Sequence, residues 1–189
     1  MKSSDLIKHL TESGLMPKEE MLEVRKSERN LFIGIPKETA LQENRVALVP
    51  DSVGLLVNNG HRVIIESNAG EAANFTDKDY SEAGAEIVSE SKEVYKANII
   101  IKVAPPTLAE IQMLDVKQKQ ILFSALQISS QPKDCIKELM KKKVTGIAYD
   151  FIKDREGVYP IVRSMSEIAG NTSILIAAEL LSNANGGHG

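Results

Sequence analysis

The sequence predicts an α/β fold in which helices cover a parallel β-sheet. Short apolar runs, typical of buried strands, alternate with helix-like segments over residues 31–164. One of these runs, ANIIIKVAPP, has an unbroken apolar centre, which indicates a strand buried on both faces. The chain has 189 residues, of which 42% are hydrophobic, so it can form one ordinary domain with a short appendage.

Residues 1–30 are predicted to be a separate helical arm. A first short helix with one apolar face ends at Gly14, and Pro17 opens a second helix whose first turn is acidic and whose far end is basic. We expect this arm to pack on the domain or on a neighbouring subunit.

The domain itself is predicted to span residues 31–164. Its strands are expected in the runs LFIGIP, HRVIIES, AEIV, ANIIIKVAPP, KQILFSAL and VTGIAYD, and its helices in PDSVGLLVNNG, YSEAG and CIKELMKKK. Cys135 falls on the inner face of the last helix, which favours a buried, unreactive thiol over a nucleophile. The acids of FTDKDYSEAG are typical of a helix start rather than of a calcium loop.

Residues 165–189 have a different character from the domain. They are predicted to form a long helix that is capped by Ser166 and stays apolar for about four turns. A helix that is apolar on nearly all sides needs several partners, so we expect the protein to be a homo-oligomer.

Composition and charge exclude several classes of protein. The 23 basic and 26 acidic residues are mixed along the chain, unlike the basic patch of a nucleic-acid-binding protein. No apolar run reaches the roughly 20 residues that span a bilayer, so no membrane insertion is expected. The single cysteine excludes an internal disulfide and fits a cytoplasmic protein. The three histidines have no metal-ligand spacing, so no metal site is expected.

Arg45, in the segment ENRVALVP, is the first candidate for a functional site. It follows a predicted strand and a turn-rich connection, which is where open α/β sheets bind their ligands. A guanidinium matches a carboxylate with two parallel hydrogen bonds. The alternative is a surface arginine that pairs with Glu38 or Glu43.

Lys102 is the second candidate, because it follows three isoleucines in a strand that should be buried. A charge in such a place must be paired or used. Pro105 and Pro106 end the strand directly afterwards, so the ammonium should face the crevice, where it can bind a carboxylate or polarise a carbonyl. The alternative is a strand-end lysine that extends to solvent.

Gln127, in FSALQISSQP, is the third candidate, at another predicted strand end. Its amide can donate and accept hydrogen bonds but cannot act as an acid at neutral pH. The alternative is an ordinary polar loop residue. The sequence has no GxGxxG fingerprint for a dinucleotide, and GGHG at residues 186–189 comes too late to be followed by a helix.

Taken together, several motifs resemble one family. IGIPKE, ENRVALVP, NNGHRVIIESNAGEAANFTDKDYSEAGAEIV, IIIKVAPP, IAYD and SMSEIAGNTS have the order and spacing of alanine dehydrogenases and of the nucleotide-binding (alpha) subunit of nicotinamide nucleotide transhydrogenases. The resemblance covers residues 31–189 and is closer to the alanine dehydrogenases. It implies a Rossmann-like, substrate-side domain followed by a hinge helix at 165–189. The chain would then stop where a separate NAD-binding Rossmann domain begins.

The resemblance also implies an activity and roles for single residues. An NAD-dependent enzyme of this kind converts L-alanine reversibly to pyruvate and ammonium. Arg45 matches the arginine that holds the substrate carboxylate, Lys102 the lysine at the reacting carbon, and Ser166 a hinge residue near the nicotinamide. Gln127 takes the place of a histidine that transfers protons in alanine dehydrogenases, and so would be a catalytic position without a proton shuttle.

Three functional hypotheses therefore follow from the sequence. The first is the substrate-side part of an alanine-dehydrogenase-like oxidoreductase, inactive by itself because the cofactor domain is absent. The second is a domain like that of the transhydrogenase alpha subunit, although the segment EGVYPIVRSMSEIAG lacks the Arg, Gln and Asp loop of that class. The third is a non-catalytic α/β module that binds a small carboxylate, which would explain Gln127 and the missing fingerprint together.

Overall fold

The computed structural model describes residues 30–188 of the chain. The helical arm predicted for residues 1–30 lies outside the described residues, apart from Asn30. The predicted division into an arm, a domain and a hinge segment therefore stays a prediction.

The described residues form a six-stranded sheet in the order β3-β2-β1-β4-β5-β6, and every pair of neighbouring strands is parallel. The predicted parallel α/β fold is thus confirmed, with a strand in each of the six predicted runs. The strand order reverses between β1 and β4, which creates the topological switch point at which open α/β sheets bind ligands. The strands are β1 (Phe32–Ile35), β2 (Arg62–Glu66), β3 (Glu86–Val88), β4 (Ile99–Ile101), β5 (Ile121–Ser124) and β6 (Thr145–Ala148).

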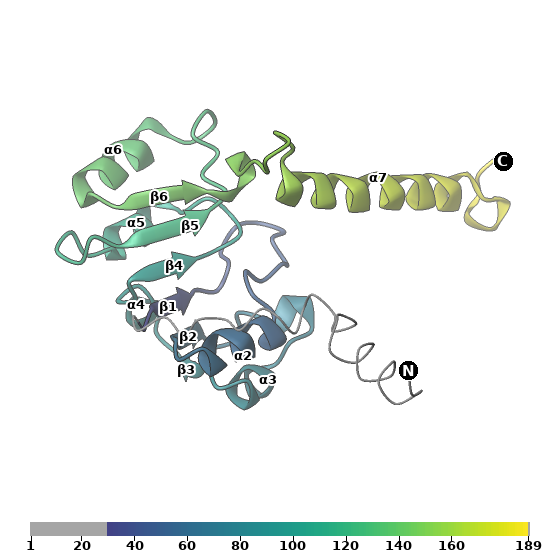
Figure 1. Ribbon diagram of the computed structural model, residues 1–189. Coiled ribbons are helices and arrows are strands. Elements are labelled where there is room, and N and C mark those ends of the chain that lie inside the picture. The colour runs from purple at the N-terminus through teal and green to yellow at the C-terminus, as the bar shows by residue number, and fades with distance from the viewer. Residues whose placement is uncertain (1–29, 189) are drawn as a thin grey trace, which may run out of the picture.

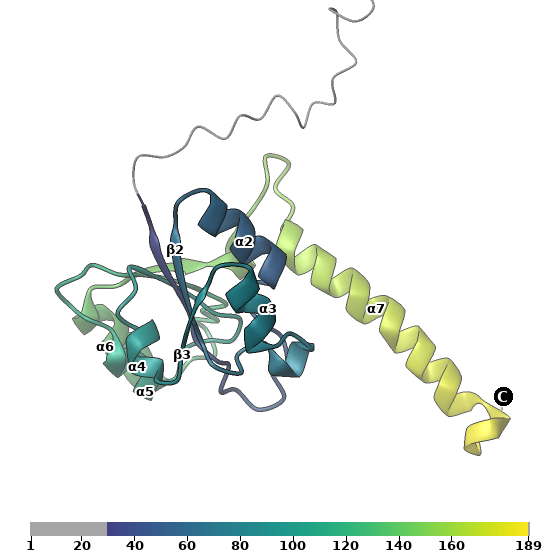
Figure 2. The same ribbon diagram turned by 90° about the horizontal axis from the view of Figure 1, so that it is seen from below.

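Helices cover both faces of this sheet. Figures 1 and 2 show α2 and α3 on one side of the strands, and α4, α5 and α6 on the other. The helices are α2 (Pro50–Asn58), α3 (Asp77–Glu82), α4 (Ser91–Val94), α5 (Leu108–Met113), α6 (Lys133–Lys142) and α7 (Pro160–Leu181), with single 3-10 turns η1 (Glu71–Ala73), η2 (Tyr149–Phe151) and η3 (Asn183–Asn185).

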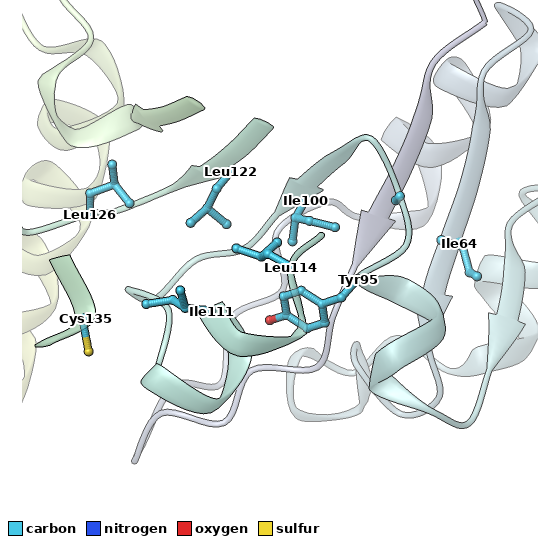
Figure 3. Packing of buried hydrophobic residues seen from close by; sticks show 9 residues of the cluster. Ile64, Tyr95, Ile100, Ile111, Leu114, Leu122, Leu126 and Cys135 are labelled. Carbon is cyan, nitrogen blue, oxygen red and sulfur yellow. The ribbon is translucent and has the colours of Figure 1, made fainter. Parts of the chain in front are cut away.

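Each covered face has its own hydrophobic core. Ile100 and Leu122 point to the side of α4, α5 and α6, where Figure 3 shows them beside Tyr95 and Ile111. Ile33, Ile35 and Val63 belong to the core under α2 and α3, and Ile99 and Ile101 pack against that core. The predicted burial of 99–101 on both faces is therefore confirmed. Cys135 is also buried, as predicted for the inner face of α6.

Two of the covering helices begin with a capping box, in which a threonine and an acid three residues later bond each other's backbone N–H groups. Thr76 and Asp79 form the one at α3, as expected from an acidic helix start. Thr107 and Glu110 form the one at α5. Glu110 lies at the sheet edge as well, so its carboxylate also takes part in the site described below.

Helix α7 projects away from the sheet, as Figure 1 shows, and none of its residues is buried. It begins at Pro160, so the predicted start at a Ser166 cap is wrong. Proline is favoured at the first helical position because its φ is already helical and it lacks an N–H. The exposed Arg163–Glu167 pair at i,i+4 supports the same early turns. Among the described residues, no helix is long and apolar enough to cross a membrane.

Candidate functional site

A pocket of about 220 Å³ opens at the carboxyl-terminal edge of the sheet. Its walls come from the connection between β1 and α2, from the end of β4, from η2 after β6, and from the start of α7. The lining residues are Arg45, Val46, Ala47, Ile101, Lys102, Val103, Tyr149, Ile161 and Met165. The pocket therefore lies at the switch point between β1 and β4, and it brings together the two predicted cations.

The Arg45 guanidinium makes a two-point ion pair with Glu43, which is one of the two acidic partners that the sequence offers for a surface arginine. Its Nε and Nη2 atoms donate to the two carboxylate oxygens at 2.7 and 2.6 Å. Its Nη1 atom lies 3.2 Å from the sulfur of Met165 on α7. Just over half of the Arg45 side chain is exposed, whereas Glu43 is largely covered. Glu43 thus occupies the Nε–Nη2 edge of the guanidinium. At the Nη1–Nη2 edge the acceptor is the sulfur of Met165, which is a weak one.

The hydrogen bonds from Arg45 hold the pKa of Glu43 below its ordinary value of 4.5. Because the folded pKa is lowered, the pair stabilises the fold above the ordinary pKa, and this stabilisation is lost as the pH falls through the folded pKa. Replacing Arg45→Gln should therefore raise the pKa of Glu43 toward its ordinary value. A carbon-13 NMR titration of the glutamate carboxylates measures this change. Glu86, whose pKa Arg62 lowers in the same way, serves as an unaffected reference.

Lys102 is fully buried and lies between two buried carboxylates. Its Nζ is 2.9 Å from Glu38 and 3.3 Å from Glu110, and the three side chains are at most 6% exposed. The sequence predicts that this ammonium must either pair with acids or serve a function, and the pairing is confirmed. A lysine has three N–H donors, and these two carboxylates take two of them.

Tyr149 is a pocket residue that sequence reasoning missed. It follows β6, its hydroxyl donates to the carbonyl of Val103 at 2.8 Å, and its ring packs against Phe123. Burial raises the pKa of the phenol, so the hydroxyl stays protonated at neutral pH. The signal was present in the motif IAYD, where a tyrosine directly follows a strand and so reaches the same sheet edge as Lys102.

The other two predicted site residues do not line the pocket. Gln127 is exposed in the loop after β5, where it has a left-handed φ of 42°. Its backbone carbonyl accepts from Ser130 and Gln131, which makes it part of a local turn. Ser166 lies inside α7 and is exposed to solvent. The alternative interpretation of Gln127 as a loop residue therefore agrees with its placement.

A second pocket, of about 170 Å³, lies between α5 and α6. Its lining is almost entirely apolar and includes Ile111, Leu126, Leu139 and the thiol of Cys135. It lacks the convergent charged groups that a catalytic or anion-binding site requires. The pocket at the switch point is therefore the better candidate.

Comparison with known families shows to which family the chain belongs. Residues 34–169 match the family described as alanine dehydrogenase/PNT, N-terminal domain. The chain belongs to this family. The matched range runs from β1 to the early turns of α7, so the alanine dehydrogenase/PNT domain includes every residue that lines the switch-point pocket. The family resemblance of the sequence motifs is thus confirmed.

Individual relatives point more strongly to alanine dehydrogenases than to transhydrogenases. Alanine dehydrogenases of Staphylococcus saprophyticus and Methanococcus maripaludis are each 42% identical, over 84% of this chain and 42% of the relative. A solved L-alanine dehydrogenase has a TM-score of 0.77 at 38% identity, over 83% of this chain and 43% of that chain. A transhydrogenase from Sinorhizobium meliloti has a TM-score of 0.59 at 25% identity, over 65% and 34%. The chain thus spans less than half the length of these relatives.

Proposed function

We propose that this chain is the substrate-side domain of an NAD-dependent oxidoreductase that interconverts L-alanine and pyruvate. The family and the names of the relatives support the activity. The observation that carries the proposal is that Arg45 and Lys102, which come from opposite sides of the switch point, line one small pocket. A pocket with two cations in its walls suits a small carboxylate.

In this proposal Arg45 holds the substrate carboxylate. Since Glu43 takes the Nε side of the guanidinium, the substrate would use the Nη1–Nη2 edge, beside Met165. The third N–H of Lys102 would donate to the carbonyl or amino group at the reacting carbon, polarising it for hydride transfer. Neighbouring apolar residues, such as Ile101 and Ile161, would exclude water from this reacting end.

The described residues do not fit a dinucleotide. At the switch point, where an anionic phosphate would approach the end of β4, the carboxylate of Glu38 already accepts the backbone N–H groups of Val103 and Ala104. Ser166, predicted to lie near the nicotinamide, is outside the pocket. We therefore propose that NAD is bound mainly by residues outside this chain, so that the chain alone is inactive.

One observation favours a non-catalytic second candidate, a module that binds a small carboxylate. Gln127 cannot transfer a proton, and its loop does not reach the pocket. The buried Tyr149 phenol, with its raised pKa, is a poor base at neutral pH. An assay with L-alanine and NAD, run beside a pyruvate-binding measurement, distinguishes the two functions, since the module binds pyruvate without turning over alanine. The likeness to a transhydrogenase is the weaker alternative.

Replacing Arg45→Lys should weaken pyruvate binding by about 1–3 kcal/mol, or roughly 5- to 150-fold, because a point charge cannot reproduce the fork of the guanidinium. Isothermal titration of the 189-residue chain with pyruvate measures this loss. Arg62→Lys is the matched control, because Arg62 also pairs with a glutamate but lies away from the pocket. Equal affinity of wild type and Arg45→Lys would contradict the proposal.

We also propose a cytoplasmic homo-oligomer. The single cysteine supports the reducing compartment. The oligomer is supported by the exposed apolar side chains of α7, which would be unfavourable on a free monomer; the largest include Ile168, Ile174, Leu175, Ile176, Leu180 and Leu181. Sedimentation equilibrium tests this, and a monomer at all concentrations would contradict it.

A further inference from the structure

The residue that would hold the substrate carboxylate lies in a segment with no regular structure. Residues 36–49, between β1 and α2, include Arg45 but contain no helix or strand. An exposed arginine on a flexible loop would sample many positions, and binding would then have to order both the loop and the side chain. Something in the fold must therefore hold this connection at the switch point.

Glu38 makes the densest set of bonds between this connection and the sheet. One of its carboxylate oxygens accepts the backbone N–H of Val103. The other accepts the N–H of Ala104 at 3.3 Å and the ammonium of Lys102 at 2.9 Å. A single side chain thus ties the connection to three consecutive residues at the end of β4. These are the donors that would otherwise attract an anionic ligand at this edge.

Glu110 completes the arrangement from the opposite side. Its carboxylate accepts from Lys102 and from the hydroxyl of Thr39, which follows Glu38 in the same connection. It also accepts the backbone N–H of Thr107 in the capping box of α5. We call Glu38, Lys102 and Glu110 the buried clasp, and the hydroxyl of Thr39 adds a partly buried hydrogen bond to it. It joins the connection, β4 and α5 at one point.

The charged groups of the clasp are shielded from solvent. The carboxylates and the ammonium are at most 6% exposed, so solvent and salt screen their attraction little. By comparison, the Arg45–Glu43 pair is partly exposed and can fix only the side chain of Arg45, not the connection that bears it.

We propose that Glu38 is a positioning residue for both cations of the pocket. It holds Lys102 directly through an ion pair. It holds Arg45 indirectly, by fixing the connection seven residues before it. This inference rests on the proposed carboxylate-binding function of the pocket. On this view Glu38 never touches the substrate, yet its loss moves the guanidinium away from the place where the substrate carboxylate binds.

The test follows the Nε–H signal of Arg45 in proton–nitrogen NMR spectra of the 189-residue chain. This N–H is bonded to Glu43 at 2.7 Å, and Arg62 has an equivalent N–H bonded to Glu86 at 2.7 Å elsewhere on the sheet. In Glu38→Gln the Arg45 signal should shift or broaden, although the side chain of Glu38 is bonded to residues 102–104 and not to Arg45. The Arg62 signal should stay in place. Pyruvate affinity, measured on the same samples, should fall by about 10- to 100-fold.

Two further variants sharpen the result. Glu71→Gln removes another carboxylate near Arg45, one that lines a separate cavity of about 70 Å³ together with Glu38 and Arg45, and it should leave both the Arg45 signal and the affinity unchanged. If Glu38→Gln does not fold, Thr39→Val removes a single hydrogen bond of the clasp and should produce the same selective shift with a smaller loss of affinity.

The possible outcomes separate this inference from the proposed function. An unchanged Arg45 signal in the folded Glu38→Gln and Thr39→Val variants would overturn the positioning role. So would equal shifts of Arg45 and Arg62, which would indicate a general loosening of the sheet. If instead Arg45→Lys leaves pyruvate affinity unchanged, the proposed function fails, and the Arg45 signal in the Glu38 variant still decides whether Glu38 positions the connection.

Discussion

Lys102→Met should lower the free energy of unfolding by about 3–5 kcal/mol, since removing one partner of a buried ion pair leaves charge without compensation. Here the loss leaves two carboxylates, Glu38 and Glu110, facing each other at no more than 6% exposure. Methionine keeps the length and the apolar stem of lysine, so lost packing contributes little to the difference. The change in the free energy of unfolding therefore measures what the positive charge of Lys102 contributes to the clasp.

Urea unfolding at neutral pH, followed by circular dichroism, measures this difference. Lys96→Met is the matched control, because Lys96 pairs with Glu93 on the surface at i,i+3. Exposed pairs of that kind contribute about 0–1 kcal/mol. If the two variants lose similar amounts of stability, the amine of Lys102 is not held in a dry ion pair, and the clasp does not exist in solution.

Gly34→Ala should destabilise the protein by about 3 kcal/mol, because β1 is packed too closely for a side chain at this point. A Cβ on Gly34 would lie 2.5 Å from the backbone oxygen of Val94 and 3.0 Å from the Cβ of Ala97. The end of α4 and the backbone after it would have to move away from the sheet, which would disturb the central strand next to the switch point.

Gly170→Ala provides an internal comparison for this variant. Gly170 lies within α7, and no atom is within 4 Å of the place where its Cβ would be. Alanine in a helix interior should there stabilise the protein by about 1 kcal/mol. Opposite signs for the same substitution, in thermal unfolding of the two variants, are expected. A tolerated Gly34→Ala would mean that α4 does not pack against β1 as described.

Most of the fold could be predicted from the sequence because each strand is a short apolar run with a turn signal at its end. The run of Ile99, Ile100 and Ile101 shows why: burial on both faces leaves no polar position in the run. The start of α7 could not be predicted from the apolar pattern, since polar residues at 163, 164, 166 and 167 interrupt that pattern in the first turns. There the decisive signals were Pro160 and the Arg163–Glu167 pair.

The candidate site was predicted in part, and the reason is geometric. Arg45 and Lys102 follow strands that meet at the switch point, so strand order alone brings them to one pocket. The acidic partners of Lys102 could not be predicted from strand order. Glu38 and Glu110 are 64 and 8 residues from Lys102, and only the question of which acids neutralise a buried lysine would have singled them out. Gln127 does not line the pocket, because it is exposed in the loop after β5.

A crystal structure of this chain with bound pyruvate tests the central claim most directly. The pyruvate carboxylate should lie within hydrogen-bond distance of Nη1 and Nη2 of Arg45, with its keto oxygen toward Nζ of Lys102 and the Glu38 clasp intact. Pyruvate bound elsewhere, or contacting neither cation at saturating concentration, would contradict the account.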